Sequence, residues 1–324
     1  MFPSILLVNP RRCVYACITI SFCFFSLQTL QAQTTAKAVP VLELNGNAYE
    51  RGLQHGKALK QDIAAVYAKW KENIRKETKG DPDSVLNSFR NAIHFESITR
   101  KYAPALFDEM KGLAVGSDQS YEDVYAFQLV DEYWVYLNRQ NNKEKHHCSG
   151  IGVKATADHP AYIAQNMDLE NYMQGYQVLL HIPATVTEPE QYILSCAGLL
   201  ALNGMNGKGI GLCVNTLMEL ESSTDGLPVA FVVRAVLAKQ DGKDALHFLQ
   251  SVKHASGQNY ILGIADSVYD FEASANQVVR FIPGSGSNQV VYHTNHALAN
   301  HDVKPWYKSS HEEVLAGTSK PRNS

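Results

Sequence analysis

Cysteine is scarce in this 324-residue chain, which has six cysteines in all. Three lie in an N-terminal apolar run, and three follow it at Cys148, Cys196 and Cys213. The first three would be removed with the signal peptide expected below, and the remaining three cannot all pair with one another, so at least one thiol is expected to be free. Cys196 and Cys213 lie in strand-like segments, where each is either a small buried apolar residue or the disulfide partner of the other.

The chain also lacks a basic stripe, an internal repeat and a low-complexity segment. Its formal net charge is −3, with residues of both signs interspersed, which argues against nucleic acid as a partner. The glycine-rich stretch 202–217 has no Gly-Lys-Ser/Thr ending and opens no helix, so a phosphate-binding loop is not expected. Its glycines and asparagines instead predict a tight hairpin.

A long hydrophobic segment is missing as well. Residues 13–27 form an apolar run of fifteen residues, fewer than the ~20 that a membrane-spanning helix needs. Arg11 and Arg12 precede this run and Ala32 follows it, a pattern typical of a secretory signal peptide. We expect cleavage near Ala32 and a secreted or periplasmic protein without stable membrane association; an uncleaved anchor is the alternative.

The remaining chain changes its periodicity at Cys148. Before it, apolar residues recur at helical spacing over 48–76, 84–116 and 121–140, and Ser120 with Asp123 is typical of a helix start. After it come short runs bounded by Gly, Pro and Asn that predict strands, interrupted by one helical block at 228–255. This order predicts an α+β fold in which sheets are layered and covered by helices.

Cys148 stands at this junction, within KEKHHCSGIGV. A structural cysteine is usually embedded in an apolar run, whereas this one follows charged residues and opens a strand. Its position favours a functional thiol. The neighbouring His146 or His147 would lower its pKa if either imidazolium lay close enough, which makes a cysteine–histidine nucleophile one possible interpretation.

Three other polar residues occupy unusual places in the strand-like half. Asp168 ends an apolar strand twenty residues after Cys148, where it is either a turn residue or a site residue held by a hairpin. Asn215 lies inside a strand, although asparagine is depleted there, so it marks either a site or a bulge. His293 and His296 flank Asn295; histidines at this spacing are weak ligand signals, and no metal or cofactor is expected.

Taken in order, these segments resemble the isopenicillin N acyltransferase (acyl-coenzyme A:6-aminopenicillanic acid acyltransferase) family of N-terminal nucleophile hydrolases. More distantly they are similar to bile salt hydrolases and penicillin V acylases. The similarity runs from about Ala48 to the end and rests on these segments: YERGLQHG, EMKGLAVGSDQSYEDVYAFQLVDE, Cys148 with Ser149, QNMD ending at Asp168, GMNGKGIGLCVNTL, the helix of Arg234, and HTNH around Asn295.

The resemblance implies a four-layer αββα sandwich of two antiparallel sheets and a chain that cleaves itself. The Cys148 thiol would attack the carbonyl of His147, and Cys148 would become an N-terminus whose α-amine, with a pKa of about 7.7–8.0, accepts the thiol proton. Asp168 would hold this amine. The Asn215 backbone N–H and the Asn295 side-chain amide would bind the oxyanion. Packing and turn roles are expected for three residues of the first motif: Gly52, Gln54 and Gly56.

Two features depart from the family pattern. Bile salt hydrolases have arginine three residues before the aspartate, whereas this chain has Gln165, which argues against a bile acid substrate. Family members also carry an arginine after an Asn-Ser pair beyond the asparagine motif. This chain ends at Asn323 and Ser324, so either it is a fragment, the interpretation we favour, or Arg322 replaces that arginine.

The sequence thus predicts a signal peptide at 1–32, a helical pro-segment or small subunit at 33–147, and a catalytic chain at 148–324 that remains associated with it. We expect an amidohydrolase or acyltransferase acting on a small-molecule linear amide or acyl substrate through a thioester. The alternatives are an unprocessed cysteine–histidine peptidase, with His293 or His296 as base, and a non-catalytic binding protein on the same scaffold.

Overall fold

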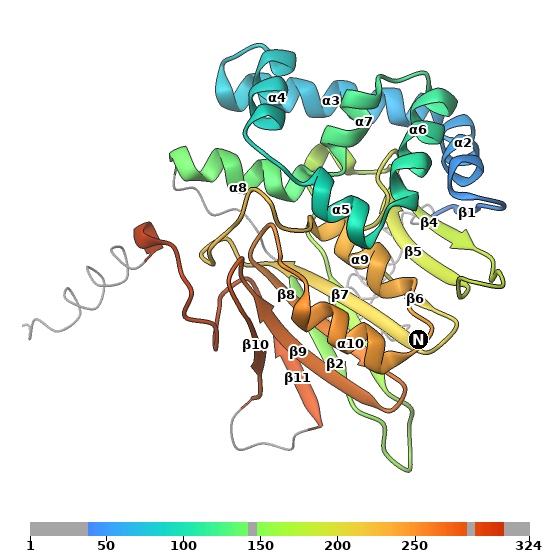
Figure 1. Ribbon diagram of the computed structural model, residues 1–324, viewed down its shortest axis with the longest axis vertical. Coiled ribbons are helices and arrows are strands. Elements are labelled where there is room, and N and C mark those ends of the chain that lie inside the picture. The colour runs from blue at the N-terminus through green and yellow to red at the C-terminus, as the bar shows by residue number, and fades with distance from the viewer. Residues whose placement is uncertain (1–37, 142–147, 284–288, 308–324) are drawn as a thin grey trace, which may run out of the picture. The chain divides into compact units, whose positions relative to one another are not determined.

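The computed structural model describes residues 38–141, 148–283 and 289–307 (Figure 1). The predicted signal peptide, His146 and His147, and the C-terminal residues from 308 onward lie outside the described residues. From Pro40 onward the described chain forms one compact unit, so the segments before and after Cys148 share a single body. No described helix is long and apolar enough to cross a membrane.

The larger sheet has eight strands in the order β1-β4-β5-β6-β7-β8-β9-β10. All neighbours are antiparallel except β1 and β4, which run parallel. Its strands have these bounds: β1 Val41–Glu43, β4 Gln177–Ile182, β5 Gln191–Cys196, β6 Asn203–Asn206, β7 Ile210–Thr216, β8 Gln258–Ile264, β9 Ser267–Ala273 and β10 Val278–Phe281. β6 and β7 form the hairpin that the glycine-rich stretch predicts, and Gly209 adopts the positive φ of 74° that its turn requires.

The smaller sheet has three strands in the order β11-β2-β3, with β2 in the centre. Its antiparallel strands are β2 Ser149–Val153, β3 Tyr162–Asn166 and β11 Val290–His293. Residues of β2 alternate between exposed and buried, as expected for a strand with one solvated face. Cys148 therefore enters the sheet on the same face as Gly150, toward the larger sheet.

Nine α-helices are described, and Figure 1 shows α2–α8 grouped together, with α9 and α10 lying against the larger sheet. Their bounds are α2 Ala48–Ala58, α3 Lys60–Thr78, α4 Pro82–Asn91, α5 Glu96–Tyr102, α6 Ala105–Ser117, α7 Tyr121–Phe127, α8 Val130–Asn141, α9 Val229–Leu237 and α10 Gly242–Ser251. The Ser120 side chain accepts from Asp123 N, which confirms the predicted helix start. The predicted helical segment 84–116 is divided among α4, α5 and α6, with breaks at 92–95 and at Ala103. The second break is expected, because the helical conformation is disfavoured for a residue that precedes proline.

Two hydrophobic clusters separate the layers. The large cluster joins the helices to one face of the eight-stranded sheet, and the small cluster, which contains Cys213, Ile261, Val268 and Val291, lies between the sheets. The α+β class and the two antiparallel sheets are thus confirmed. In the described residues the helices, the larger sheet and the small sheet form three of the four expected layers. The fourth is not seen there, since the outer face of the small sheet carries exposed side chains such as that of Tyr292, which is 58% exposed.

Glycines let α2 and α6 pack with their backbones in contact. A methyl group at Gly52 would lie 1.8 Å from Glu109 O, and one at Gly56 would lie 2.5 Å from Leu113 O. Gln54 exchanges two hydrogen bonds with the backbone of Asn45 at the entry to α2. The structure agrees with packing and turn roles for this motif.

The segment before Cys148 is tied to the strand-rich half by buried polar contacts. Arg234 of α9 makes a two-pronged ion pair with Glu109 of α6, at 2.6 and 2.8 Å. His55 accepts from Gly198 N at 3.2 Å, and Gln128 donates to Gly198 O at 2.9 Å and accepts from Leu200 N at 2.7 Å. These contacts position the loop after β5, which reaches the site described below.

Candidate functional site

Cys148 lies at the start of β2 and is 8% exposed. Its backbone N–H donates to Asn295 Oδ1 at 2.5 Å. Burial raises the pKa of the thiol, partly offset by hydrogen bonds from the Asp168 backbone and the Asn295 side chain. The thiol therefore needs a base to become a nucleophile near neutral pH.

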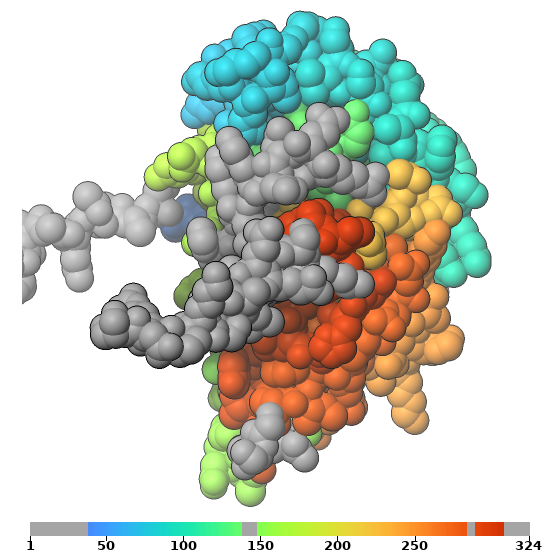
Figure 2. All heavy atoms as spheres, turned by 90° about the vertical axis from the view of Figure 1, so that its left-hand side faces the viewer, coloured from blue at the N-terminus to red at the C-terminus, as the bar shows by residue number. Residues whose placement is uncertain are grey.

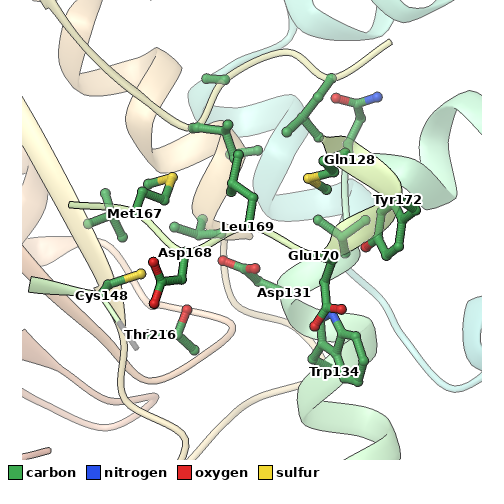
Figure 3. Close-up of a pocket in the computed structure, with 18 of the residues that line it drawn as sticks. Gln128, Asp131, Trp134, Cys148, Met167, Asp168, Leu169, Glu170, Tyr172 and Thr216 are labelled. Carbon is green, nitrogen blue, oxygen red and sulfur yellow. The ribbon is translucent and has the colours of Figure 1, made fainter. Parts of the chain in front are cut away.

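A pocket of about 420 Å³ opens beside Cys148 (Figure 3). Helices α8 and α9, the loop after β5, β7 and the segment after β3 all contribute to its wall. Its lining residues are Gln128, Val130, Asp131, Trp134, Cys148, Met167, Asp168, Leu169, Glu170, Asn171, Tyr172, Met173, Leu199, Ala201, Leu202, Val214, Thr216, Val229 and Ala230. A mostly apolar cavity with a few convergent polar groups is the usual form of a small-molecule site.

Asp168 reaches this pocket through the β2–β3 hairpin. Ser149 pairs with Asn166 in that hairpin, so the two strands bring residues twenty apart in sequence to the same edge. In Figure 3 the Asp168 carboxylate lies beside Cys148 and Thr216. The structure therefore brings together Cys148 and Asp168, as the sequence predicts.

Asn295 is placed by β11, which pairs with β2 so that His293 faces Gly150. Its side chain bridges two strands: Oδ1 accepts from Cys148 N, and Nδ2 donates to Thr216 O at 2.9 Å. Asn295 thus touches the backbone on which the Cys148 thiol is carried. The expected grouping of Cys148, Asp168 and Asn295 holds.

Asn215 does not line the pocket. The side chains of Val214 and Thr216 do so, and alternation along β7 turns Asn215 toward the small sheet, where its Nδ2 donates to Asn259 Oδ1 and His293 O, both at 3.2 Å. Leu217 N donates to Gly257 O across the β7–β8 ladder, so the N–H of Asn215, two residues earlier, also faces β8. This geometry departs from the expected oxyanion role of Asn215.

Thr216 is the residue of β7 that sequence reasoning missed. Its side chain lines the pocket, and its carbonyl accepts from Asn295. Its N–H lies on the edge of β7 away from β8, the edge on which Val214 N donates to Gln165 Oε1. The sequence predicted this strand correctly but not which of its residues meet the pocket, because a shift by one residue exchanges the two faces of a strand.

Gln165 ties the two sheets together beside the site. Its Nε2 donates to Val214 O at 2.5 Å and to Asn215 Oδ1 at 3.0 Å, and its Oε1 accepts from Asn203 Nδ2 at 2.9 Å. The amide that stands in place of arginine therefore has partners at both ends. We read it as a structural tie.

Glu272 of β9 fixes the loop that carries Asn295, and sequence reasoning missed it too. Its carboxylate accepts from His293 Nε2 at 2.8 Å and from the backbone N–H of Leu298, Ala299 and Asn300 at 2.6 to 3.2 Å. Burial opposes ionisation of Glu272, but these hydrogen bonds hold its pKa below the usual value. In YDFEAS the acids Asp270 and Glu272 alternate with aromatic residues, and this pattern was the available signal that one face of the strand is polar.

A second glutamate supports the same loop from the other side. Ala297 N donates to Glu219 Oε1. Further along, Glu221 N donates to Asp302 O at 2.9 Å, which places the end of the described chain against the segment after β7 (red beside yellow in Figure 2). The asparagine loop is thereby held between β9 and the end of β7.

The other two thiols do not contribute to the pocket. Cys196 and Cys213 are both free, and they lie in different hydrophobic clusters, on opposite faces of the larger sheet. Burial raises the pKa of each to about 12. Of the two interpretations left open for them, the structure supports small buried apolar residues.

His293 and His296 do not form a metal site in the described residues, where no three His, Cys, Asp or Glu side chains are grouped to hold an ion. His293 is buried with Nε2 on Glu272 and Nδ1 on Thr294 O at 2.8 Å. Burial alone would lower its pKa, but the hydrogen bond to Glu272 raises it. His296 is exposed.

The fold and the site define an α+β protein with a buried thiol at the head of an inner strand, beside a carboxylate and an amide. Residues 155–316 match the model of the family described as acyl-coenzyme A:6-aminopenicillanic acid acyl-transferase. This match covers half of the chain, and the chain therefore belongs to that enzyme family.

Individual proteins are more distant. Protein dcd1A of Dictyostelium discoideum is 23% identical over 235 residues, which are 64% of this chain and 51% of that protein. An N-acylethanolamine-hydrolyzing acid amidase ortholog from Caenorhabditis elegans has 15% identity and a TM-score of 0.37, over 50% of this chain and 73% of the other. A conjugated bile acid hydrolase variant from Clostridium perfringens has 15% identity and a TM-score of 0.35, over 52% and 58%. The chain spans about half the length of the curated relative that it matches.

Proposed function

We propose that this chain is an exported, self-cleaving N-terminal-cysteine enzyme that cleaves linear amides through a thioester acyl-enzyme. The observation that carries the proposal is the position of Cys148. Its thiol opens onto the pocket, its backbone N–H is held by Asn295, and Asp168 lies beside it. Family membership supports an amide-cleaving or acyl-transferring activity.

Self-cleavage would proceed at the His147–Cys148 bond. The Cys148 sulfur adds to the His147 carbonyl carbon, the C–N bond breaks, and the acyl group moves from nitrogen to sulfur as a thioester. Water then hydrolyses the thioester, which frees the thiol and leaves Cys148 with an α-amine. The hydrogen bond from Cys148 N to Asn295 Oδ1 supports this step, because it fixes the bond that must break.

In the mature chain the α-amine would accept the thiol proton and later return it to the leaving amine. Asp168 would hold the amine. Since Asn215 faces β8 and the small sheet, we assign the backbone oxyanion donor to Thr216, with the Asn295 amide as the second donor. Each such donor lowers the barrier by roughly 3–4 kcal/mol.

Cleavage would leave the two segments associated. β1 supplies an edge strand to the larger sheet by pairing with β4, Arg234 is bonded to Glu109, and Glu132 accepts from Val229 N at 3.0 Å. These contacts cross the proposed cleavage point and do not include His147.

Hydrolysis is favoured over acyl transfer, because acyl-coenzyme A is scarce outside the cytoplasm.

The rival cysteine–histidine peptidase has less support. Both ring nitrogens of His293 face acceptor oxygens, of Glu272 and of Thr294 O, so both act as donors and neither offers a free lone pair to a proton from Cys148. His296 is exposed and does not line the pocket. A self-base mechanism requires no histidine.

Turnover of simple amides tests the proposal. Pentanoyl, decanoyl and phenylacetyl p-nitroanilides would be offered to the wild type, Cys148→Ala and the control Cys213→Ala. We expect release of nitroaniline and an acyl adduct on Cys148 that hydroxylamine removes, with both lost only in Cys148→Ala. Turnover by Cys148→Ala, or adducts elsewhere, would contradict a Cys148 thioester.

A further inference from the structure

Asp131 projects into the pocket from the first turn of α8, and the proposed mechanism does not use it. In Figure 3 its carboxylate lies between Asp168 and Glu170. Within the described part of the chain, no hydrogen bond or ion pair reaches this carboxylate, and burial alone raises its pKa to about 6. Its neighbour Glu132 instead accepts from Val229 N and from the Ser256 hydroxyl.

The charged residues that line the pocket are all acidic: Asp131, Asp168 and Glu170. The remaining wall is largely apolar, with Trp134, Tyr172 and Leu199 among its residues. Asp168 is already assigned to the α-amine of Cys148, so that amine offsets one charge. Asp131 remains as a half-buried carboxylate facing a partly apolar cavity, and the neighbouring acidic residues add to the free-energy cost of its charge until an opposite charge pairs with it.

Asp131 lies close to the reacting thiol. Its charge contributes to the raised pKa of Cys148, after burial, and both residues line the pocket, with the Asp168 carboxylate between them in Figure 3. A group bound to Asp131 would therefore lie in the same pocket as a carbonyl carbon attacked by Cys148.

We propose that Asp131 selects amides that carry a positively charged amino group near the scissile bond and disfavours substrates with a carboxylate at that place. This inference rests on the proposed function and names its substrate class. The ammonium group would donate to the Asp131 carboxylate in the apolar cavity, where the attraction between opposite charges is stronger than in water.

A structural role is the competing explanation, since acidic residues are favoured in the first turn of any helix. That role would change the stability of Asp131 variants without altering which charges the site prefers. Charge preference at Cys148 therefore separates the two explanations, and melting temperatures report the structural effect alongside it.

Thiol reagents of different charge measure this preference without any substrate. Aminoethyl, ethyl and sulfonatoethyl methanethiosulfonates are cationic, neutral and anionic; each forms a disulfide with the Cys148 sulfur and releases methanesulfinate. Rates at Cys148 would be followed by peptide mass spectrometry and divided by rates with 2-mercaptoethanol. The proteins are the full chain, Asp131→Asn, Asp131→Glu and Glu122→Gln, which removes an exposed charge from α7 away from the pocket.

We expect the wild type to favour the cationic over the anionic reagent well beyond the free thiol, and Asp131→Asn to lower this ratio about tenfold. Asp131→Glu and Glu122→Gln should keep it. An unchanged ratio in Asp131→Asn would overturn the inference. If that variant does not fold, a wild-type ratio equal to that of the free thiol would overturn it as well.

Turnover completes the test. 4-Aminobutyryl, pentanoyl and glutaryl p-nitroanilides have nearly the same shape but end in a cation, a methyl group and an anion. We expect kcat/KM to fall in that order in the wild type and the differences to shrink in Asp131→Asn. Equal values for the first two would contradict the substrate class, whereas absence of any Cys148-dependent turnover would contradict the proposed function and leave the reagent result standing.

Discussion

The two faces of the larger sheet differ in chemistry although they belong to the same strands. On the helix side, Leu212, Tyr260 and Phe271 join the large hydrophobic cluster. On the side of the small sheet, the same strands present Cys213 and Ile261 at one end. At the other end Asn215 is hydrogen-bonded to Asn259 and to His293, and His293 to Glu272.

This difference separates stability from positioning. The helix side buries large apolar groups, which supply most of the folding free energy. The polar end between the sheets gains little from burial, but its hydrogen bonds fix the loop of Asn295 against Cys148. A change on the first face should therefore act on unfolding, and a change on the second should act on the reaction.

The largest effect on stability is expected at Arg234. Arg234→Ala would leave the Glu109 carboxylate buried beside α9 without its two-pronged partner and should lower the free energy of unfolding by about 3–5 kcal/mol. Urea denaturation measures it. Arg280→Ala, which removes an exposed arginine from β10, is the control and should cost less than about 1 kcal/mol. Equal losses in the two variants would mean that the buried pair does not support the helix side.

Glu132 tests the helix side through pH. Burial raises its pKa to about 7, against 4.5 for an ordinary glutamate. The folded state therefore binds the Glu132 proton more tightly than the unfolded state does. The resulting contribution to the free energy of unfolding is complete below pH 4.5 and is lost as pH rises through 7. The interval corresponds to about 3 kcal/mol.

Glu132→Gln should remove that part of the pH dependence. The variant should match the wild type near pH 5 and exceed it near pH 8, because glutamine keeps an acceptor for Val229 N and Ser256 and never ionises. Unfolding free energies at both pH values provide the measurement. Parallel pH profiles for the two proteins would contradict burial of an ionisable Glu132.

Glu272→Gln tests the polar end. The Glu272 carboxylate accepts from His293 and from three backbone N–H groups, and a glutamine amide has neither its charge nor its second acceptor oxygen. The Asn295 loop should therefore move, and self-cleavage should slow by about 10- to 100-fold. A time course of chain cleavage gives the rate. Asp266→Asn, in the exposed turn after β8, should leave it unchanged; a slower Asp266→Asn would point to a general loss of structure.

The smallest effect is expected at the apolar end. Cys213→Ala removes one buried sulfur from the small cluster and should cost about 1 kcal/mol of stability with no change in processing. Thermal unfolding and cleavage rates check this together. A cleavage defect in Cys213→Ala would erase the distinction between the two ends of the inter-sheet face.

Much of this arrangement was predictable from the sequence. Strand-like runs and turn residues predicted the strands, and the motif around Cys148, Asp168 and Asn295 predicted residues that the fold does bring together. Periodicity could not fix which face of β7 meets the pocket, so Thr216 was missed in favour of Asn215. Glu272 was missed because its partners are the N–H groups of a loop more than twenty residues away, a contact that local patterns do not encode. The roles of these residues stay predictions.

The central claim is that Cys148 becomes an N-terminal nucleophile, and intact mass spectrometry of the purified exported protein tests it most directly. We predict two fragments for the wild type and for Cys213→Ala, one of them beginning at Cys148, and a whole chain for Cys148→Ala. A single uncut chain in the wild type, or cutting that persists in Cys148→Ala, would contradict the account.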